Sequence, residues 1–562
     1  MASIVSKTIS GRAYYYLVES ARVDGKPRIV SQRYLGPAEE VLARLSGSGA
    51  GEPSATRHVA FGDLAASLGM VRRLRIAEIA DEVAGPRRAD ALASVGTYLA
   101  LGVANRLSAP CSKLAFSTWW KKTAGPRLTK LPVAALDHRR FWDAAEILST
   151  ETLSEIERRV AAHAATAFDL DLSALVLDMT NFATFIDSGN PAAGLAKRGH
   201  AKQKRNDLRL LGLALVVTAD GAVPILSHPY PGDRPDVTQF PVVLSELAER
   251  YRELGKAVER LTIVYDAGCD SAANQELIEE AGISFVGSLP PSQHPELLAA
   301  PRSRYRTLDP ALFPGLTAFE TKAVALGARR RVVVTHSDTF HARQARGFAQ
   351  TLAAATRRLG ELSARLAGAR TRRSKEQVAA EIAEILAPRW LDRVIVWELS
   401  GDTPATLRLS FRVDEAARRR LEAEVFGKRV LFTDRDDWTV EEVVAAYRSQ
   451  AIVESGFRQL KDVHIISFSP MYSWTDRKIR VHVLTCVLAL AAAHLMRREA
   501  LRAGFELSVR ELLGTLAQIQ ETELVYRGEK GRPRVRRMLT DMDADQRRLY
   551  ELFGLDAFAP KR

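Results

Sequence analysis

Cysteine is scarce in this sequence, which limits the kinds of site it can build. The three cysteines, Cys111, Cys269 and Cys486, are scattered over 562 residues and form no CxxC pair. We therefore expect neither a disulfide framework nor a zinc cluster built on cysteine. So few cysteines suit a protein of the reducing cytoplasm.

A membrane-spanning segment is also missing from the pattern of the sequence. The longest apolar run, 481–496, is interrupted by His482 and His494 and falls short of the about 20 residues that cross a bilayer. The chain shows no N-terminal charged-then-apolar secretory pattern. We expect residues 481–496 to form a buried core helix, and we expect no membrane partner.

Acidic residues are outnumbered by basic ones. The 80 Lys and Arg residues against 67 Asp and Glu give a formal net charge of +13, and the sequence pI is about 9.7. This balance favours a polyanionic partner, either nucleic acid or an anionic membrane surface, and the missing span leaves nucleic acid as the stronger candidate. The length allows three or four domains with substantial cores.

The N-terminal residues 1–45 read as a β-hairpin followed by a helix. β-favouring runs at 14–23 and 28–34 flank the turn signal Asp24-Gly25. The basic side chains of this region either contact phosphates or form a solvated face; they are Arg12, Arg22, Lys26, Arg28 and Arg33. The Gly- and Ser-rich residues 46–58 read as a linker.

Residues 59–165 carry apolar side chains at helical spacing, broken by short Gly, Pro and Ser stretches. Basic residues mix here with Trp119, Trp120 and Trp142, a combination that suits contact with a DNA backbone. Any small helical bundle shows a similar pattern. We interpret this part as a helical region that binds DNA ends.

From residue 173 the sequence pattern becomes typical of β-strands. Apolar runs at 173–180, 210–217, 223–228, 261–268 and 283–289, with helices between the later ones, predict a five-stranded mixed sheet. Asp178 and Asp266 stand at the ends of two of these strands. Those strands can be neighbours, which would bring the two carboxylates together.

A second segment, 445–461, carries polar groups at regular spacing. Tyr447, Glu454 and Lys461 are each seven residues apart, so on one continuous helix they would project from nearly one face. Between it and the first strands, residues 301–437 mix strands with helical matter at 340–386, where leucines every seven residues favour a helical pair. Asp178, Asp266 and Glu454 together are the kind of carboxylate set that holds two divalent metals for phosphodiester cleavage.

These features resemble the DDE transposases of bacterial insertion sequences. The resemblance rests on Asp-x-Thr after a strand, Tyr-Asp-Ala-Gly after a later strand, and Tyr-x6-Glu-x6-Lys on a helix, and it covers about residues 173–500. It is closest to the family with a Tyr-Arg-Glu-Lys signature and a large insertion before the catalytic Glu. This chain departs from that signature at Gln450, where the family has Arg.

The resemblance implies an α/β fold whose catalytic core is an RNase H-like mixed five-stranded sheet with an α+β insertion. It implies that Asp178, Asp266 and Glu454 bind two Mg2+ ions, which Mn2+ can replace. It further implies DNA contacts from Tyr447, Lys461, Arg448 and Arg458 and from a basic loop that supplies Lys197, Arg198, Lys202, Lys204 and Arg205.

The domain organisation expected from these patterns has seven parts. They are the N-terminal hairpin and helix (1–45), the linker (46–58), the helical DNA-end-binding region (59–165), the first part of the core (170–300), the insertion (301–437), the second part of the core (438–480) and a C-terminal helical region (481–562).

The function implied is cut-and-paste transposition in a bacterial cytoplasm, close to the nucleoid. The partners would be double-stranded DNA, both terminal inverted repeats and target DNA, and a second copy of the chain on that DNA. Two alternatives stay open: a stand-alone DNA endonuclease, and a catalytically silent DNA-binding protein.

Overall fold

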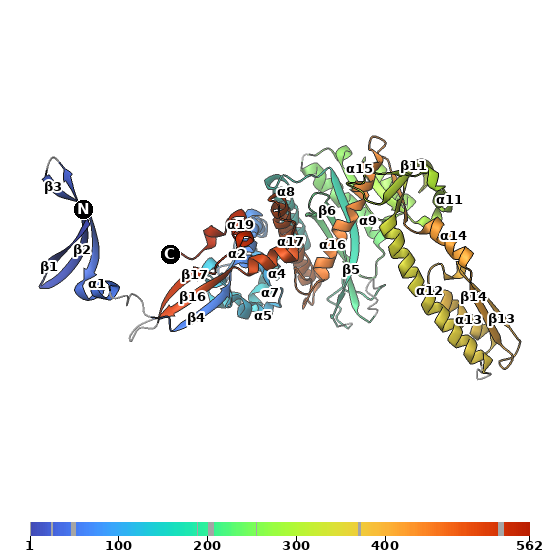
Figure 1. Ribbon diagram of the computed structural model, residues 1–562, viewed down its shortest axis with the longest axis horizontal. Helices are drawn as coiled ribbons and strands as arrows, with labels where there is room; N and C mark the ends of the chain where they lie inside the picture. The colour runs from blue at the N-terminus through green and yellow to red at the C-terminus, as the bar shows by residue number, and fades with distance from the viewer. Residues whose placement is uncertain are drawn as a thin grey trace. The chain divides into compact units, whose positions relative to one another are not determined.

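A computed structural model describes most of the chain. The described residues are 2–23, 26–45, 52–187, 189–200, 207–254, 256–368, 373–526 and 533–561. They fall into two compact units (Figure 1): the first comprises 1–66, 118–130 and 513–562, the second 67–117 and 131–512.

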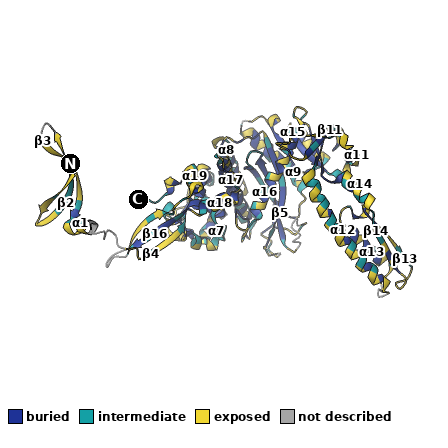
Figure 2. Ribbon diagram, viewed as in Figure 1, coloured by how far each residue is buried: buried dark blue, intermediate teal, exposed yellow. Residues whose placement is uncertain are grey.

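The first unit begins with a small antiparallel sheet. Its strands are β1 (Ala2–Ile9), β2 (Arg12–Val23) and β3 (Lys26–Pro37), in that spatial order, followed by α1 (Ala38–Leu45). The expected hairpin is therefore β2 and β3, while β1 is an additional strand that we did not predict. Val18 is buried in this sheet, whereas Ile4, Ile29 and Tyr34 are more than half exposed (Figure 2).

A second sheet of this unit joins distant parts of the chain. It consists of β4 (Ala55–Ala60), β16 (Gln520–Tyr526) and β17 (Arg534–Leu539), with β16 in the middle. Two predictions need correction here: the linker 46–58 runs into a strand, and the C-terminal region 481–562, expected to be helical apart from a basic loop at 527–537, contains two strands. Because β4 pairs with a strand more than 450 residues away, no local pattern reveals it.

Residues 62–167 are largely helical, as expected for 59–165. They are α2 (Gly62–Arg73), α3 (Ile76–Ala84), α4 (Val95–Ser108), α5 (Lys113–Trp120), α6 (Gly125–Thr129), α7 (His138–Ile147) and α8 (Thr150–Ala167). The later helices α17 (Asp476–Arg502), α18 (Val509–Ala517) and α19 (Ala544–Leu552) are also present. In its length and composition α17 could cross a membrane, but 83% of its most apolar stretch is buried inside the fold, as expected of a core helix.

A nine-stranded mixed sheet organises the second unit. Its spatial order is β10-β11-β12-β15-β9-β8-β5-β6-β7. The strands are β5 (Ala174–Thr184), β6 (Arg209–Thr218), β7 (Pro224–Pro231), β8 (Thr262–Val264), β9 (Ser284–Leu289), β10 (Arg306–Thr307), β11 (Leu316–Ala325), β12 (Ala328–Ser337) and β15 (Lys428–Thr433). The predicted count of five is too small, because four strands from residues 301–437, the segment that we assigned to the insertion, extend the same sheet.

The part of 301–437 outside that sheet is smaller than predicted. It lies between β12 and β15 and contains α12 (Asp338–Ala367), α13 (Lys375–Leu386), α14 (Glu415–Val425) and the paired strands β13 (Ile395–Ser400) and β14 (Arg408–Val413). The heptad leucines of α12 are buried: Leu352, Leu359 and Leu366. In Figure 1 the long α12 runs beside α13 and this hairpin.

The sheet also carries the helices α9 (Asp236–Glu253), α10 (Ala272–Glu280), α15 (Val440–Arg448) and α16 (Gln450–Lys461). Of these four, α15 and α16 line the candidate site. Helix α16 packs on β5, α15 packs on β9, and α17 packs on α16 and β7.

Candidate active site

Three acidic side chains from three separate segments line one cleft of the second unit. Asp178 comes from β5, Asp266 from the loop after β8, and Glu454 from α16. The cleft has a volume of about 460 Å³. The three residues named from the sequence are therefore brought to one place by the fold.

The cleft opens where one neighbour of β5 stops. Strand β8 pairs in parallel with β5 only as far as Val176 and Val264, whereas β6 accompanies β5 over its whole length. Beyond Val176 this side of β5 pairs with no strand among the described residues, and Asp178 lies two residues past that point. Asp178 therefore lies in the middle of a longer strand. Our prediction that it stands at the end of a strand is wrong. Asp266 follows β8 by two residues.

The expected single helix through 445–461 is broken. Helix α15 ends at Arg448 and α16 begins at Gln450, with Ser449 between them; its hydroxyl donates to the Ala446 carbonyl (2.5 Å). Tyr447 is therefore not on the same helix as Glu454 and Lys461, and the prediction of one shared face is wrong.

Three hydrogen bonds attach these two helices to the strands of the site. The Tyr447 hydroxyl donates to Asp266 Oδ1 (3.1 Å), Gln450 Nε2 donates to the Leu177 carbonyl (3.2 Å), and Lys461 Nζ donates to Thr180 Oγ1 (2.7 Å). Gln450 is buried and satisfies a carbonyl just beyond the point where β8 pairing ends. The contacts of Gln450 and Lys461 hold α16, and with it Glu454, against β5. The contact of Tyr447 holds α15 to Asp266.

The acidic oxygens differ in how far they are already used. Asp266 Oδ1 accepts from Ser288 Oγ (2.8 Å) and from Tyr447, while Asp178 Oδ1 accepts from the Met179 N–H (2.7 Å). Glu454 is exposed and accepts no hydrogen bond within the described chain. Oxygen atoms of this kind are the ligands that Mg2+ prefers. In the described ranges no three His, Cys, Asp or Glu side chains are close enough to hold one ion.

Burial keeps Tyr447 protonated. Its side chain is 6% exposed, and burial, followed by the negative charge of Asp266, raises its pKa to about 12. The phenol therefore remains a hydrogen-bond donor to Asp266 across the physiological pH range.

A further carboxylate near the site, Asp270, lies four residues after Asp266 and does not line the cleft; we did not single it out from the sequence. Burial and then the charge of Asp266 raise its pKa to about 8, and neither of its buried oxygens has a hydrogen-bond partner in the described part of the chain. Asp270 ends the segment Tyr-Asp-Ala-Gly-Cys-Asp. Nothing in the spacing of that segment distinguishes Asp270 from an ordinary turn residue.

The cleft also has basic lining residues, which we call its arginine wall. They are Arg343, Arg429 and Arg448, and the sequence reading named only Arg448. Arg429 Nη1 donates to the Tyr447 hydroxyl (3.1 Å). Arg448 lies over the Phe313 ring, 5.5 Å from its centroid.

The other DNA contacts expected from the sequence lie elsewhere or outside the described residues. Arg458 is exposed on α16 and does not line the cleft; Lys197 and Arg198 are exposed before β6. Lys202, Lys204 and Arg205 fall in 201–206, outside the described residues. No bound DNA tests these assignments, which stay predictions.

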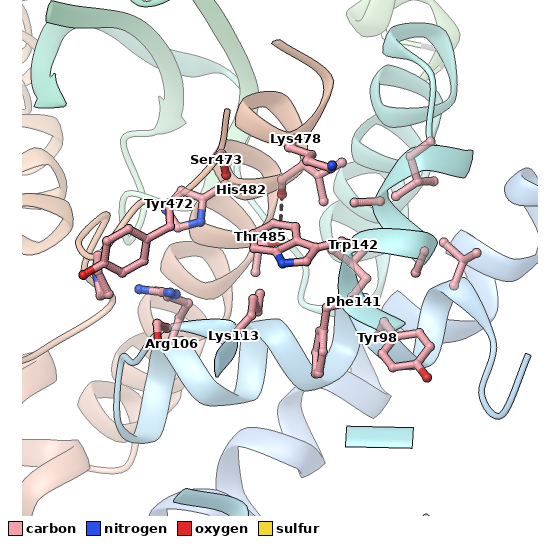
Figure 3. A pocket seen from close by; sticks show the side chains of 18 residues that line it. Tyr98, Arg106, Lys113, Phe141, Trp142, Tyr472, Ser473, Lys478, His482 and Thr485 are labelled. Atoms are coloured by element: carbon pink, nitrogen blue, oxygen red, sulfur yellow. Dashed lines mark hydrogen bonds between the residues drawn. The ribbon is translucent and has the colours of Figure 1, made fainter. Parts of the chain in front are cut away.

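A second cavity, between α4, α5, α7 and α17, has a different character. It is lined largely by apolar and aromatic side chains, with Arg106 and Lys113 directed into it (Figure 3). Burial, and next the charge of Arg106, lower the pKa of Lys113 to about 8. No Asp or Glu lines this cavity, so the acid-bearing cleft is the candidate active site.

A family model described as "Transposase DDE domain" matches residues 170–490. A cryo-EM structure of the piggyBac transposase synaptic complex with hairpin DNA matches with 10% sequence identity and a TM-score of 0.35, over 83% of this chain and 82% of that chain. No curated protein matches this chain.

Proposed function

We propose, from the premise that this chain belongs to the transposase DDE family, that it is a DNA transposase that cuts an insertion sequence at its ends and joins it to target DNA. The observation that carries the proposal is the convergence of Asp178, Asp266 and Glu454 on one cleft. The family model spans the three segments that supply these residues.

The carboxylates would hold two Mg2+ ions, for which Mn2+ can substitute. Such a pair of cations supplies Lewis-acid charge to the attacking and leaving oxygens of an in-line displacement at phosphorus. The donor chemistry fits, because all three side chains offer hard oxygens and Glu454 has no competing hydrogen bond within the described residues. Negatively charged carboxylates repel one another when no cation lies between them. Binding of the ions would therefore draw the three carboxylates closer together.

The remaining residues of the site act by holding the carboxylates in position. Tyr447 donates to Asp266 and fixes the orientation of its carboxylate. Gln450 and Lys461 anchor α16 to β5, which sets the place of Glu454. Because the hydroxyl of Tyr447 is already used by Asp266 and Arg429, we assign this residue to positioning in preference to a phosphate contact.

One site serves both stages of the reaction. In the first, water attacks a phosphorus at the element end, and the strand's 3′ oxygen leaves and takes up a proton. In the second, that 3′ hydroxyl attacks a phosphorus of target DNA, and a target 3′ oxygen leaves. Both are in-line attacks of oxygen on phosphorus, so the same carboxylates serve each.

We further propose an RNase H-like core. The order β7-β6-β5-β8-β9 supports it, with β5, β6 and β7 antiparallel and β8 and β9 parallel to β5. The partners proposed are terminal inverted repeats, target DNA and a second copy of the chain on that DNA, in a bacterial cytoplasm. The net charge of +13 supports the DNA partner.

A plasmid carrying the element's ends, incubated with the protein, Mg2+ and target DNA, tests the proposal. Joined products would support transposition. Cut ends without joining would indicate a stand-alone endonuclease, and binding without cleavage a silent DNA-binding protein. An Asp178→Asn variant, matched in fold by its circular dichroism, is the control for a contaminating nuclease.

A further inference from the structure

The arginines of the arginine wall have no acidic partner among the described residues. Arg343, Arg429 and Arg448 are exposed, and within the described residues none of them forms an ion pair, although the cleft they line contains three carboxylates. Arginines just outside it are paired: Arg306 with Glu441 (2.7 Å) and Arg331 with Glu320 (2.7 Å). An unpaired cationic wall facing a cleft favours an anionic ligand.

Two of these arginines are held in place by an aromatic ring. The guanidinium carbons of Arg343 and Arg429 lie 5.1 Å and 4.8 Å from the centroid of Phe340. Arg429 is also 5.6 Å from the Tyr447 ring. Stacking uses the faces of the guanidinium groups and leaves most N–H donors at their edges. The pair is therefore partly organised before any ligand arrives.

The arginine wall is directly connected to the acidic residues of the cleft. Arg429 donates to the Tyr447 hydroxyl, which in turn donates to Asp266, and both hydrogen bonds measure 3.1 Å. An anion held by Arg429 would thus lie beside the phosphate on which the carboxylates act. A DNA strand offers such an anion, because it carries a phosphate at every nucleotide.

We propose that Arg343 and Arg429, stacked on Phe340, form a binding site for the backbone phosphates next to the scissile phosphate on the strand being cut. This inference rests on the proposed function and specifies how its cleft takes the DNA. The guanidinium edges bind phosphate oxygens in pairs, which fixes the register of the strand against the three carboxylates. Arg429 also acts as a positioning residue, through Tyr447, on Asp266.

Uncharged phosphates test this site directly. Element-end DNAs would each carry one methylphosphonate at a position flanking the cleavage site, and single-turnover cleavage would be measured at saturating protein. We expect one such position to slow the unaltered protein about tenfold, as the loss of a charge-assisted hydrogen bond would. Arg343→Gln or Arg429→Gln should slow cleavage of unmodified DNA to a similar extent. The methylphosphonate at that position should not slow these variants any further, because the interaction with the phosphate charge is already absent.

The matched control is Arg346→Gln. Arg346 is exposed on the same helix, one turn beyond Arg343, and does not line the cleft, so this variant should respond to every methylphosphonate as the unaltered protein does. Arg429→Lys keeps the charge without the fork and should recover part of the rate lost in Arg429→Gln.

The outcomes separate this inference from the function on which it rests. If the unaltered protein does not cut unmodified DNA, the proposed function fails. If it cuts, but Arg343→Gln and Arg429→Gln respond to every methylphosphonate as strongly as it does, the phosphate site is wrong and the transposase proposal stands.

Discussion

The candidate site and the cavity of Figure 3, both in the second unit, each contain arginine without a carboxylate partner among the described residues, yet they use it in different ways. In the cavity of Figure 3, Arg106 is 1% exposed and donates to the carbonyls of Ser467 (2.8 Å), Ser469 (3.1 Å) and Cys111 (3.0 Å). In the cleft, Arg343 and Arg429 are exposed and most of their donors are unused. Arg106 is therefore part of the structure, and the cleft arginines are available to a ligand.

The cleft and the cavity of Figure 3 also differ in their acidic lining residues. The cleft contains Asp178, Asp266 and Glu454, of which Glu454 accepts no hydrogen bond within the described chain. The cavity between α4 and α17 is lined by no acid, and its Lys113 ammonium lies 4.9 Å from the centroid of the Phe141 ring. Changes in the cleft should therefore alter chemistry, and changes in the cavity should alter stability.

The largest effect is expected from the carboxylates. Asp178→Asn, Asp266→Asn and Glu454→Gln should each slow cleavage by about 1,000-fold or more, since a metal ligand worth several kcal/mol is lost. DNA binding measured by mobility shift should stay within about threefold, because the arginine wall is unchanged. Normal cutting by any of the three variants would remove that residue from the site.

A smaller loss of cleavage rate is expected when Asp266 keeps its charge but loses the hydrogen bond from Tyr447. Tyr447→Phe removes the hydrogen bond to Asp266 and the acceptor for Arg429 while keeping the ring. A hydrogen bond to a charged group is worth about 1.5–3 kcal/mol, so single-turnover cleavage should slow by about 10- to 100-fold. An unchanged rate would show that Asp266 does not need this contact.

In the other cavity the same kind of change should lower stability and leave chemistry intact. Arg106→Ala leaves three carbonyls without their donor, at about 1–3 kcal/mol for each group that stays buried and unsatisfied. Thermal unfolding should show a lowered midpoint, and cleavage per folded molecule should match that of the unaltered protein. A cleavage defect in the folded fraction would break the contrast between the two cavities.

The smallest effect should come from Lys113 and depend on pH. Its pKa is about 8 in the folded protein against a usual value of 10.5, so between these values the unfolded chain binds a proton that the folded protein has released. Stability should therefore rise with pH across this window, and Lys113→Met should remove about 2 °C of that rise in the unfolding midpoint. Thermal scans at pH 8 and pH 10 measure it; an unchanged difference would place Lys113 in a solvated setting.

The acidic residues of the site could be named from the sequence because each follows a short local pattern. Asp178 and Asp266 adjoin apolar runs that form β5 and β8, and Glu454 belongs to a helical repeat. Features set by tertiary packing could not be named in this way. The break at Ser449 and the unequal lengths of β8 and β6 beside β5 depend on neighbours distant in the chain.

The arginine wall shows the same limit. Arg343 and Arg429 are 86 positions apart and meet only because α12 and β15 bring them to one ring, Phe340. We singled out neither residue as a site residue from the sequence, because nothing in its local spacing connects one to the other. The pairing of β4 with β16 is a further case, since each strand is short and its partner is remote.

The most direct test of the central claim is to locate Mn2+ in a crystal of the protein with its end DNA. Anomalous scattering should show two ions in the cleft, coordinated by oxygens of Asp178, Asp266 and Glu454. Ions bound elsewhere, or a cleft in which Glu454 stays remote from the ions held by the two aspartates, would contradict it.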